Sequence, residues 1–232
     1  LGLPAGIILS NLVFLIASTM VAPADFAQWG WRIPFIASAV LVVVGVMIRM
    51  RVAESPIFEQ VRRSQLARRM PVIDVLRTDA RTVLLAAGSY VAISALGYIT
   101  IVYFVSYATR QLGLTLPLTL ALLLGSAVLF AGSIYVSAAW SDRIGRRRVM
   151  QWGMAALVLW SVIYFPLADT KSAPLIGLSL AGMLAIQGAY IGPQPAVFSE
   201  LFPTTIRYSG VSLALTLGTI IGGAPAPTIA TF

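Results

Sequence analysis

The feature that most constrains this chain is a short charged loop between two long uncharged runs. The loop is Ser141-Asp142-Arg143-Ile144-Gly145-Arg146-Arg147-Arg148. Residues 111–141 and 149–168 on either side of it carry no charge. Each run is long enough to cross a bilayer as a helix, which takes roughly 20 apolar residues. The sequence therefore predicts a tight helical hairpin whose turn lies at a membrane surface.

The composition favours an integral membrane protein. Hydrophobic residues make up 59% of the chain and charged residues 10%, with a mean hydropathy of +0.90, which is more apolar sequence than a soluble core needs. The formal charge of +8 comes from arginines between the apolar runs, so it indicates topology signals and anionic lipid, not nucleic acid. The chain has no cysteine and no histidine, so we expect no disulfide, no metal and no cofactor.

Seven charge-poor segments follow one another along the chain. Their lengths and the lack of alternating ten-residue strands predict helices. The predicted spans are 1–24, about 26–48, 82–109, about 114–140, 149–168, 172–199 and 208–232. We therefore predict an all-α integral membrane protein with seven transmembrane helices. Because the chain starts at Leu1 and stops at Phe232 inside an apolar run, we expect an incomplete bundle, a fragment of a longer protein.

The positions of the Lys and Arg residues orient the spans, because these residues collect on the cytoplasmic side of membrane proteins. If 141–148 is inside, then 49–81 and 199–208 are inside as well. These three segments hold all but three of the 16 Lys and Arg residues, the exceptions being Arg32, Arg110 and Lys171. The sequence thus predicts a multi-pass plasma (inner) membrane protein with residues 49–81, 141–148 and 199–208 in the cytoplasm.

The longest polar stretch is 49–81. Ser55-Pro56 has the pattern of a helix N-cap followed by proline at the first helical position, and Pro71 could open a second short helix. Two compatible interpretations follow. The segment is an amphipathic helix lying on anionic headgroups, or it is a hinge that links two helical bundles.

Candidate solute-contacting residues come from neutral polar side chains, since no predicted span carries a charge in its interior. Gln187, Tyr190 and Gln194 recur at i, i+3 and i+7, which places them on one helix face. Gly192-Pro193 predicts a bend or break in that helix, of the kind tolerated where backbone lines a cavity or is covered by protein. The alternative interpretation of this face is hydrogen bonding between helices.

Other spans carry related patterns. Tyr90, Ser94 and Tyr98 step by four along 82–109 and form a second candidate substrate-pathway face. The last span has a stripe of hydroxyl side chains for which helix packing is favoured, namely Ser209, Ser212, Thr216 and Thr219. Two pairs of glycines have the spacing that allows close helix approach, namely Gly188 with Gly192 and Gly218 with Gly222.

Glu200 and Arg207 bracket 201–206 at the predicted cytoplasmic end of the sixth span. An ion pair between these two residues could latch a cytoplasmic gate in one conformation and release it in another. An exposed pair contributes little stability by itself. The Glu200–Arg207 pair would therefore affect gating only if it forms in one of the two conformations and not in the other.

Four stretches in this order point to one family. They are Gly30-Trp31-Arg32-Ile33-Pro34-Phe35, Glu54-Ser55-Pro56-Ile57-Phe58, Asp142-Arg143-Ile144-Gly145-Arg146-Arg147, and Gly192-Pro193-Gln194 continuing through Glu200-Leu201-Phe202-Pro203 to Arg207-Tyr208-Ser209-Gly210. The third is similar to the D-R-x-G-R-R loop of the major facilitator superfamily. Together the four stretches resemble the metabolite:proton symporter family within it.

The resemblance implies a major facilitator-type helical bundle of which this chain holds the fifth to the eleventh of twelve helices. Residues 1–50 would then be the last two helices of the amino-terminal bundle, 51–80 the cytoplasmic linker, and 81–232 the carboxy-terminal bundle without its final helix. The implied function is secondary active transport, a proton-coupled symport of a small metabolite such as an organic acid or osmolyte by alternating access. The family's proton-coupling charges usually lie in helices outside this chain, so no coupling residue is assigned.

Within the resemblance, Asp142, Arg143, Gly145, Arg146 and Arg147 form a conformational-switch loop. Asp142 can accept hydrogen bonds from an adjacent helix N-terminus, where the helix dipole favours an anion. The arginines can pair with neighbouring helices or with lipid phosphates. Breaking such contacts would let the two bundles rock. The alternative is that the arginines only anchor the topology.

Other functional classes are weighed against this one. A retinal photosensor needs a lysine within a span, whereas Lys171, the only lysine, lies in a loop. An enzyme has few candidate groups without His, Cys or an intramembrane carboxylate, so none is expected. The alternative to a transporter is a non-transporting seven-helix membrane protein, either a receptor or a structural subunit.

Overall fold

The computed structural model describes residues 2–51, 71–204 and 206–231, and these residues form helices and no strand. Within them, seven helical stretches are long and apolar enough to cross a membrane. They are Gly2–Met20, Gly30–Arg51, Ala80–Arg110, Leu116–Ile144, Arg146–Asp169, Ala173–Leu201 and Arg207–Ile229. The all-α fold and the order of the seven predicted spans are confirmed.

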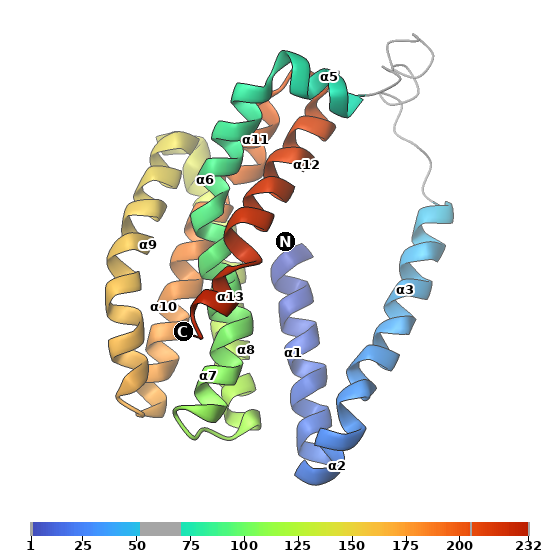
Figure 1. Cartoon of the computed structure of the whole chain (residues 1–232), viewed down its shortest axis with the longest axis vertical. Coiled ribbons are helices and arrows are strands. Elements are labelled where there is room, and N and C mark those ends of the chain that lie inside the picture. The colour runs from blue at the N-terminus through green and yellow to red at the C-terminus, as the bar shows by residue number, and fades with distance from the viewer. Residues whose placement is uncertain (1, 52–70, 205, 232) are drawn as a thin grey trace.

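Several spans are built from more than one helical element (Figure 1). In chain order these elements are α1 (Gly2–Met20), α2 (Pro23–Gln28), the 3-10 helix η1 (Gly30–Arg32), α3 (Ile33–Arg51), α5 (Pro71–Thr78), α6 (Ala80–Tyr98), the π-helix η2 (Ile99–Tyr103), α7 (Phe104–Arg110), α8 (Leu116–Ile144), α9 (Arg146–Asp169), α10 (Ala173–Ile191), α11 (Gln194–Leu201), α12 (Arg207–Gly218), the π-helix η3 (Thr219–Gly223) and α13 (Ala226–Ile229). The sixth span breaks between Ile191 and Gln194, as Gly192-Pro193 predicts, because proline cannot donate a helical hydrogen bond.

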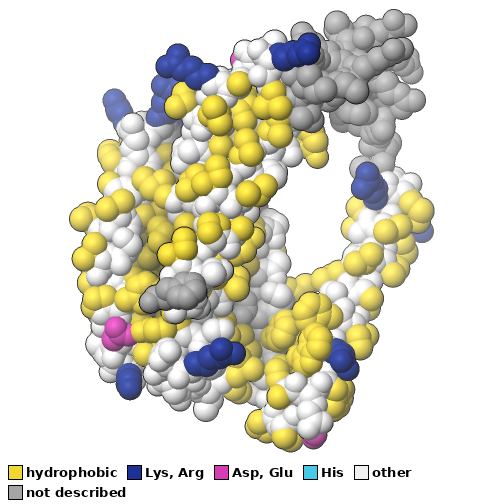
Figure 2. All heavy atoms as spheres, viewed as in Figure 1, with side chains coloured by type: hydrophobic (Ala, Val, Ile, Leu, Met, Phe, Trp, Pro, Cys, Tyr) yellow, Lys and Arg dark blue, Asp and Glu magenta, His cyan; other side chains and the backbone are white. Residues whose placement is uncertain are grey.

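The connections between spans gather at two ends of the molecule. In Figure 1 the α8–α9 turn, α5 and the α11–α12 connection lie together at the top, and α2 and the α7–α8 and α9–α10 loops lie at the bottom. Figure 2 shows Lys and Arg side chains near these ends and mainly hydrophobic or neutral surface between them. The described residues 71–81, the 141–148 loop and the α11–α12 connection, which were predicted to share one side of the membrane, therefore lie at one end of the bundle.

Only part of 49–81 can be compared with its prediction. Within the described residues the short helix α5 covers Pro71–Thr78, where a second short helix was predicted, and its Val75 is buried against Phe198 and Phe202 in a core that also includes Ala214. The predicted cap at Ser55-Pro56 and the amphipathic helix that would follow it fall in 52–70, outside the described residues.

α10 lies at the centre of the packing and contacts both α8 and α9. The contact with α8 is close because a Cβ atom on Gly188 would lie 1.9 Å from Ser133 Oγ, and one on Gly192 would lie 2.0 Å from Ser137 Oγ. The second glycine pair works in the same way, since a Cβ atom on Gly222 would lie 2.1 Å from the Val91 carbonyl oxygen. The prediction of close helix approach at both pairs is confirmed, and van der Waals packing of this kind holds helices together in lipid.

α3 is the least packed span. None of the residues in its most hydrophobic stretch is buried, and it lies away from the α6–α13 bundle in Figure 1. Its described neighbours are α1 and η1, with Phe14 and Phe35 in an edge-to-face contact 6.1 Å apart. A helix that is apolar all round requires lipid or other helices on its remaining faces.

We expect Gly222→Ala to lower the free energy of unfolding, because its new methyl group would overlap the Val91 carbonyl oxygen. Overpacking of a tight contact typically costs about 1–3 kcal/mol. The measurement is the thermal unfolding midpoint of the purified protein in detergent. Gly125→Ala in α8 is the matched control, since nothing lies within 4 Å of the position that its Cβ atom would occupy. Equal midpoints for the two variants would contradict this account of the α6–η3 contact.

Candidate functional site

A cavity of about 420 Å³ lies among α1, α6, η2, α8, α10 and η3. Its lining residues are Leu3, Ile7, Tyr90, Ile93, Ser94, Gly97, Tyr98, Ile101, Val102, Phe130, Gln187, Ile191 and Thr219. Four of the six predicted substrate-pathway residues are among them, namely Tyr90, Ser94, Tyr98 and Gln187. All of the lining side chains are neutral, so the wall offers hydroxyl groups, one amide and apolar surface.

The three α6 side chains share one face of the helix because they step by four residues. The backbone of η3 packs directly against two of them, since a Cβ atom on Gly223 would lie 2.6 Å from Ser94 Oγ and 2.7 Å from the Tyr98 ring. Any side chain at this position would displace them. The glycines of η3 therefore help to define the cavity wall, and Thr219 at the start of η3 forms part of it.

Gln187 lines the cavity, and its amide is held by a contact that the sequence did not predict. Its Nε2 atom donates a hydrogen bond of 3.3 Å to Thr100 Oγ1, and Thr100 Oγ1 donates one of 2.7 Å to the Leu96 carbonyl oxygen. Thr100 is fully buried in the π-helix η2. The available signal was a lone threonine in an otherwise apolar stretch, which by itself does not distinguish a backbone-bonded threonine from a functional one.

The other two residues predicted on the Gln187 face do not line this cavity. Tyr190 is buried, and its hydroxyl donates a 2.7 Å hydrogen bond to the Ser89 carbonyl oxygen of α6. Residues three apart on a helix are rotated by about 60° from each other, which is enough to turn Tyr190 towards a different neighbour. Gln194 is buried at the start of α11, after the break at Gly192-Pro193 has ended the register of α10.

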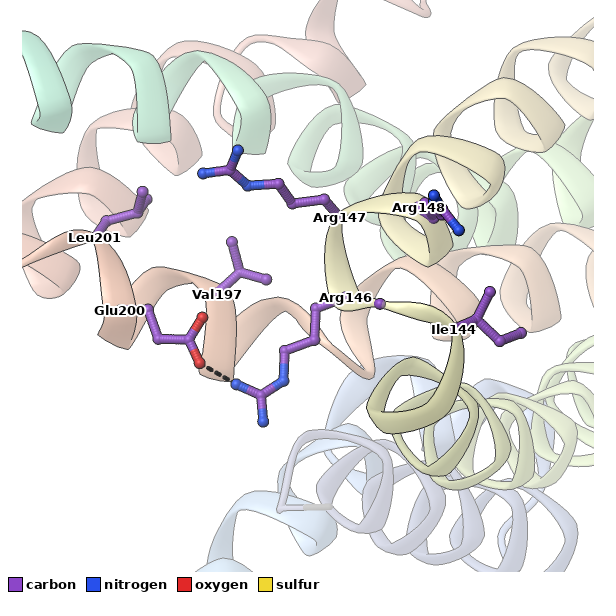
Figure 3. Close-up of a pocket in the computed structure, with 8 residues that line it drawn as sticks. Ile144, Arg146, Arg147, Arg148, Val197, Glu200 and Leu201 are labelled. Carbon is purple, nitrogen blue, oxygen red and sulfur yellow. Dashed lines mark hydrogen bonds and ion pairs between the residues drawn. The ribbon is translucent and has the colours of Figure 1, made fainter.

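The charged loop forms its contacts at the arginine-rich end of the bundle. The helix reverses direction at Gly145, whose φ of +103° lies in the region that glycine adopts without strain. Arg146 pairs with Glu200 of α11 (Figure 3). Its guanidinium group also lies 3.2 Å from an Asp142 carboxylate oxygen. The loop is therefore tied to the end of the sixth span by a three-residue ion-pair network.

This network differs from the pair predicted from the sequence. Glu200 is bound to Arg146, whereas Arg207 Nε donates a 3.4 Å hydrogen bond to the Phe202 carbonyl oxygen. Arg207 thus binds within the α11–α12 connection itself. Glu200 pairs with Arg146, which follows the α8–α9 turn. Asp142, expected to meet a helix N-terminus, pairs with Arg146 four residues along the chain.

The remaining switch-loop residues lie around the same network. A pocket of about 570 Å³ is lined by Arg146, Arg147 and Arg148 together with Ile144, Gly145, Val197, Glu200 and Leu201 (Figure 3). Arg147 also lines a second pocket against α6. Arg143 is exposed. At the opposite end, Tyr107 donates a hydrogen bond to Asp169, an α7–α9 link that the sequence did not predict.

A transmembrane helical bundle with a neutral polar cavity between its spans and a charged turn at one end defines a polytopic membrane protein with an internal solute-sized site. The chain belongs to the Major Facilitator Superfamily, whose family model matches residues 5–227. That assignment confirms the resemblance drawn from the sequence and the helical-bundle fold class.

Three relatives show where the chain lies within this family. It is 34% identical over 235 residues to the inner membrane metabolite transport protein YhjE of Escherichia coli K12, covering 99% of this chain and 53% of the relative. It is 32% identical to the shikimate transporter of the same organism, covering 99% and 53%. It is 29% identical to the proline/betaine transporter of that strain, covering 97% and 47%.

The chain therefore spans about half the length of the curated relatives it matches. No solved structure is significantly similar to it. The apolar helices and the inner-membrane relative together identify a multi-pass protein of the plasma (inner) membrane.

We expect Tyr190→Phe to lower the free energy of unfolding by about 1 kcal/mol, because it leaves the Ser89 carbonyl oxygen without its hydroxyl donor. Thermal unfolding in detergent measures this effect. Tyr98→Phe removes the same hydroxyl from a cavity-lining side chain that is 41% exposed, and we expect it to leave stability nearly unchanged. If Tyr98→Phe were the more destabilising of the two, the assignment of Tyr190 to helix packing would be wrong.

Proposed function

We propose that the protein containing this chain is a secondary active transporter that moves a small polar metabolite by alternating access. The observation that carries the proposal is the neutral polar cavity. It has Leu3 and Ile7 of α1 on one side and Tyr90, Ser94 and Gln187 of the 81–232 bundle on the other. A site shared between two packed bodies opens to one end or the other when the bodies tilt, which is how rocking-bundle transporters work.

The domain organisation proposed from the sequence fits this mechanism. Residues 1–50 would belong to the amino-terminal bundle, 51–80 to the cytoplasmic linker and 81–232 to the carboxy-terminal bundle. α1 packs against α8, so this contact would be the one that slides during rocking. The exposed faces of α3 would be covered by lipid and by helices of the amino-terminal bundle.

The arginine-rich end would act as a cytoplasmic latch within the 81–232 bundle, by holding the α8–α9 turn against α11 in only one of the two conformations. Arg146 and Glu200 are 36% and 62% exposed, so we expect their pair to contribute under about 1 kcal/mol. A difference of that size still changes the ratio of two conformations several-fold, because 1.4 kcal/mol is a factor of ten. The neighbouring arginines would contact anionic lipid headgroups at the same surface.

The substrate class follows from the cavity together with the relatives. Shikimate, proline and betaine appear in the names of related transporters, and all are small, polar and compatible with a cavity of this size. The wall carries no charge, so the charged group of an organic acid or osmolyte would need a partner from helices outside this chain or from a helix N-terminus. Proton coupling is proposed on the family resemblance, with the coupling residues in the amino-terminal helices.

The proposed orientation can be tested with single cysteines, because these 232 residues contain none. Thr170 in the α9–α10 loop and Thr204 in the α11–α12 connection are both exposed. These two connections lie at opposite ends of the bundle in Figure 1. In intact cells, a membrane-impermeant thiol reagent should label Thr170→Cys and leave Thr204→Cys unmodified until the cells are opened. Labelling of Thr204→Cys from outside would overturn the proposed topology.

Transport can be tested with vesicles that hold the full-length protein. An inward proton gradient should drive accumulation of at least one of shikimate, L-proline and glycine betaine, and a protonophore should abolish that accumulation. Glu200→Gln should change the maximal rate by roughly 2–5-fold with normal membrane insertion, in keeping with the small energy of an exposed ion pair. Uptake that is the same with and without the proton gradient would contradict symport. If none of shikimate, L-proline and glycine betaine is taken up, the proposed substrate class is wrong.

A further inference from the structure

The amide group of Gln187 is held in one orientation by Thr100. The Thr100 hydroxyl lies 2.7 Å from the Leu96 carbonyl oxygen and 3.3 Å from Gln187 Nε2. A threonine hydroxyl has a single proton, and the Leu96 carbonyl, which can only accept, takes it here. Towards Gln187 the Thr100 oxygen is therefore an acceptor. That requires the NH₂ group of the amide, not its carbonyl oxygen, on the side of Thr100.

The carbonyl side of the same amide then faces Gly97. Gln187 Oε1 lies 3.7 Å from the position that a Cβ atom on Gly97 would occupy, and glycine has no side chain to cover it. Gln187 and Gly97 both line the cavity of about 420 Å³. The cavity wall therefore has a fixed hydrogen-bond acceptor at this point.

Thr219, a second residue of the cavity wall, can also only accept a hydrogen bond from a solute. The Thr219 hydroxyl donates a 2.8 Å hydrogen bond to the Leu215 carbonyl oxygen, so only its lone pairs remain for a partner in the cavity. The hydroxyls of Tyr90, Ser94 and Tyr98 on the same wall can donate or accept. The fixed polar groups of the cavity are thus acceptors, and this bias favours a ligand that brings donors.

We propose that Thr100 is a positioning residue that turns the Gln187 carbonyl oxygen into the cavity, and that the transported solute donates an N–H or O–H hydrogen bond to it. This inference rests on the proposed function, because it takes the cavity as the solute site. It narrows the solute class to small molecules with an N–H or O–H donor, such as proline and shikimate, and excludes glycine betaine, which has neither. Analogues in which that donor is methylated would leave a buried acceptor unpaired, which weakens binding by about 5–100-fold.

The test compares matched pairs of solutes in vesicles that hold the full-length transporter. L-Proline is paired with N,N-dimethylproline, and shikimate with its tri-O-methyl ether, so that each pair differs only in replacing donor protons with methyl groups. Inhibition constants are measured against whichever donor-bearing solute the wild type accumulates. We expect the donor-bearing member to bind at least 5-fold more tightly to the wild type.

Two variants make the Gln187 carbonyl oxygen less available to a solute without deleting Gln187. Thr100→Val has nearly the same shape but no acceptor, so the amide is free to turn and the ratio of inhibition constants should fall below about 2-fold. Gly97→Ala places a methyl group in van der Waals contact with Oε1. It should lower the ratio of inhibition constants because the methyl group covers the acceptor. Thr100→Ser is the control, since it keeps the hydroxyl and should keep the wild-type ratio.

A readout independent of transport reports the orientation directly. The side-chain ¹⁵N amide resonance of Gln187, identified by its loss in Gln187→Met, should shift in Thr100→Val and stay in place in Thr100→Ser. An unchanged resonance or an unchanged ratio in Thr100→Val would overturn the role of Thr100. Equal binding of methylated and unmethylated solutes by the wild type would overturn the donor requirement. If no solute is accumulated while the resonance responds as expected, the proposed function fails and the Thr100–Gln187 contact stands.

Discussion

Hydrocarbon offers no hydrogen-bond partner, so the backbone N–H and C=O groups in the spans of this protein have to be paired within the protein itself. The backbone meets that demand inside the helices. Many hydroxyl side chains turn back to a carbonyl oxygen of their own helix, as Ser126 does to Leu122 and Thr109 does to Val105. Few polar groups are left for contacts between helices. Each such contact therefore fixes how one helix lies against its neighbour.

Those few contacts divide the bundle into a rigid part and a part that can bind. Ser137 bonds to the Gly188 carbonyl oxygen and Trp160 to that of Ser179, which fixes α10 against α8 and α9 where glycines already bring the helices close. Tyr190 adds a link from α10 to α6. The cavity lies among these rigid contacts, on the side where α1 faces α6 and α10. In the proposed mechanism, a cavity with firm walls on one side and the proposed amino-terminal bundle on the other would enclose a solute and then release it.

Local patterns in the sequence were sufficient wherever the controlling interaction is local. Proline ends α10 before Pro193 because its ring and missing N–H act within one turn of helix. The spacing of Tyr90, Ser94 and Tyr98 set their common face for the same reason. The π-helices η2 and η3 were not predicted, since an extra residue in a turn of helix is decided by how the helix packs on its neighbours.

By itself, the sequence determined seven segments long and apolar enough to cross a membrane, with an arginine-rich turn between the fourth and fifth, because hydrophobic length and charge act through the solvent around each segment. Only the tertiary structure decided which polar groups meet. It placed Gln187 against Thr100 and Tyr190 against Ser89. It also paired Glu200 with Arg146. Such choices depend on the rotation and depth of one helix against another, and those are set by side-chain packing between residues far apart in the chain.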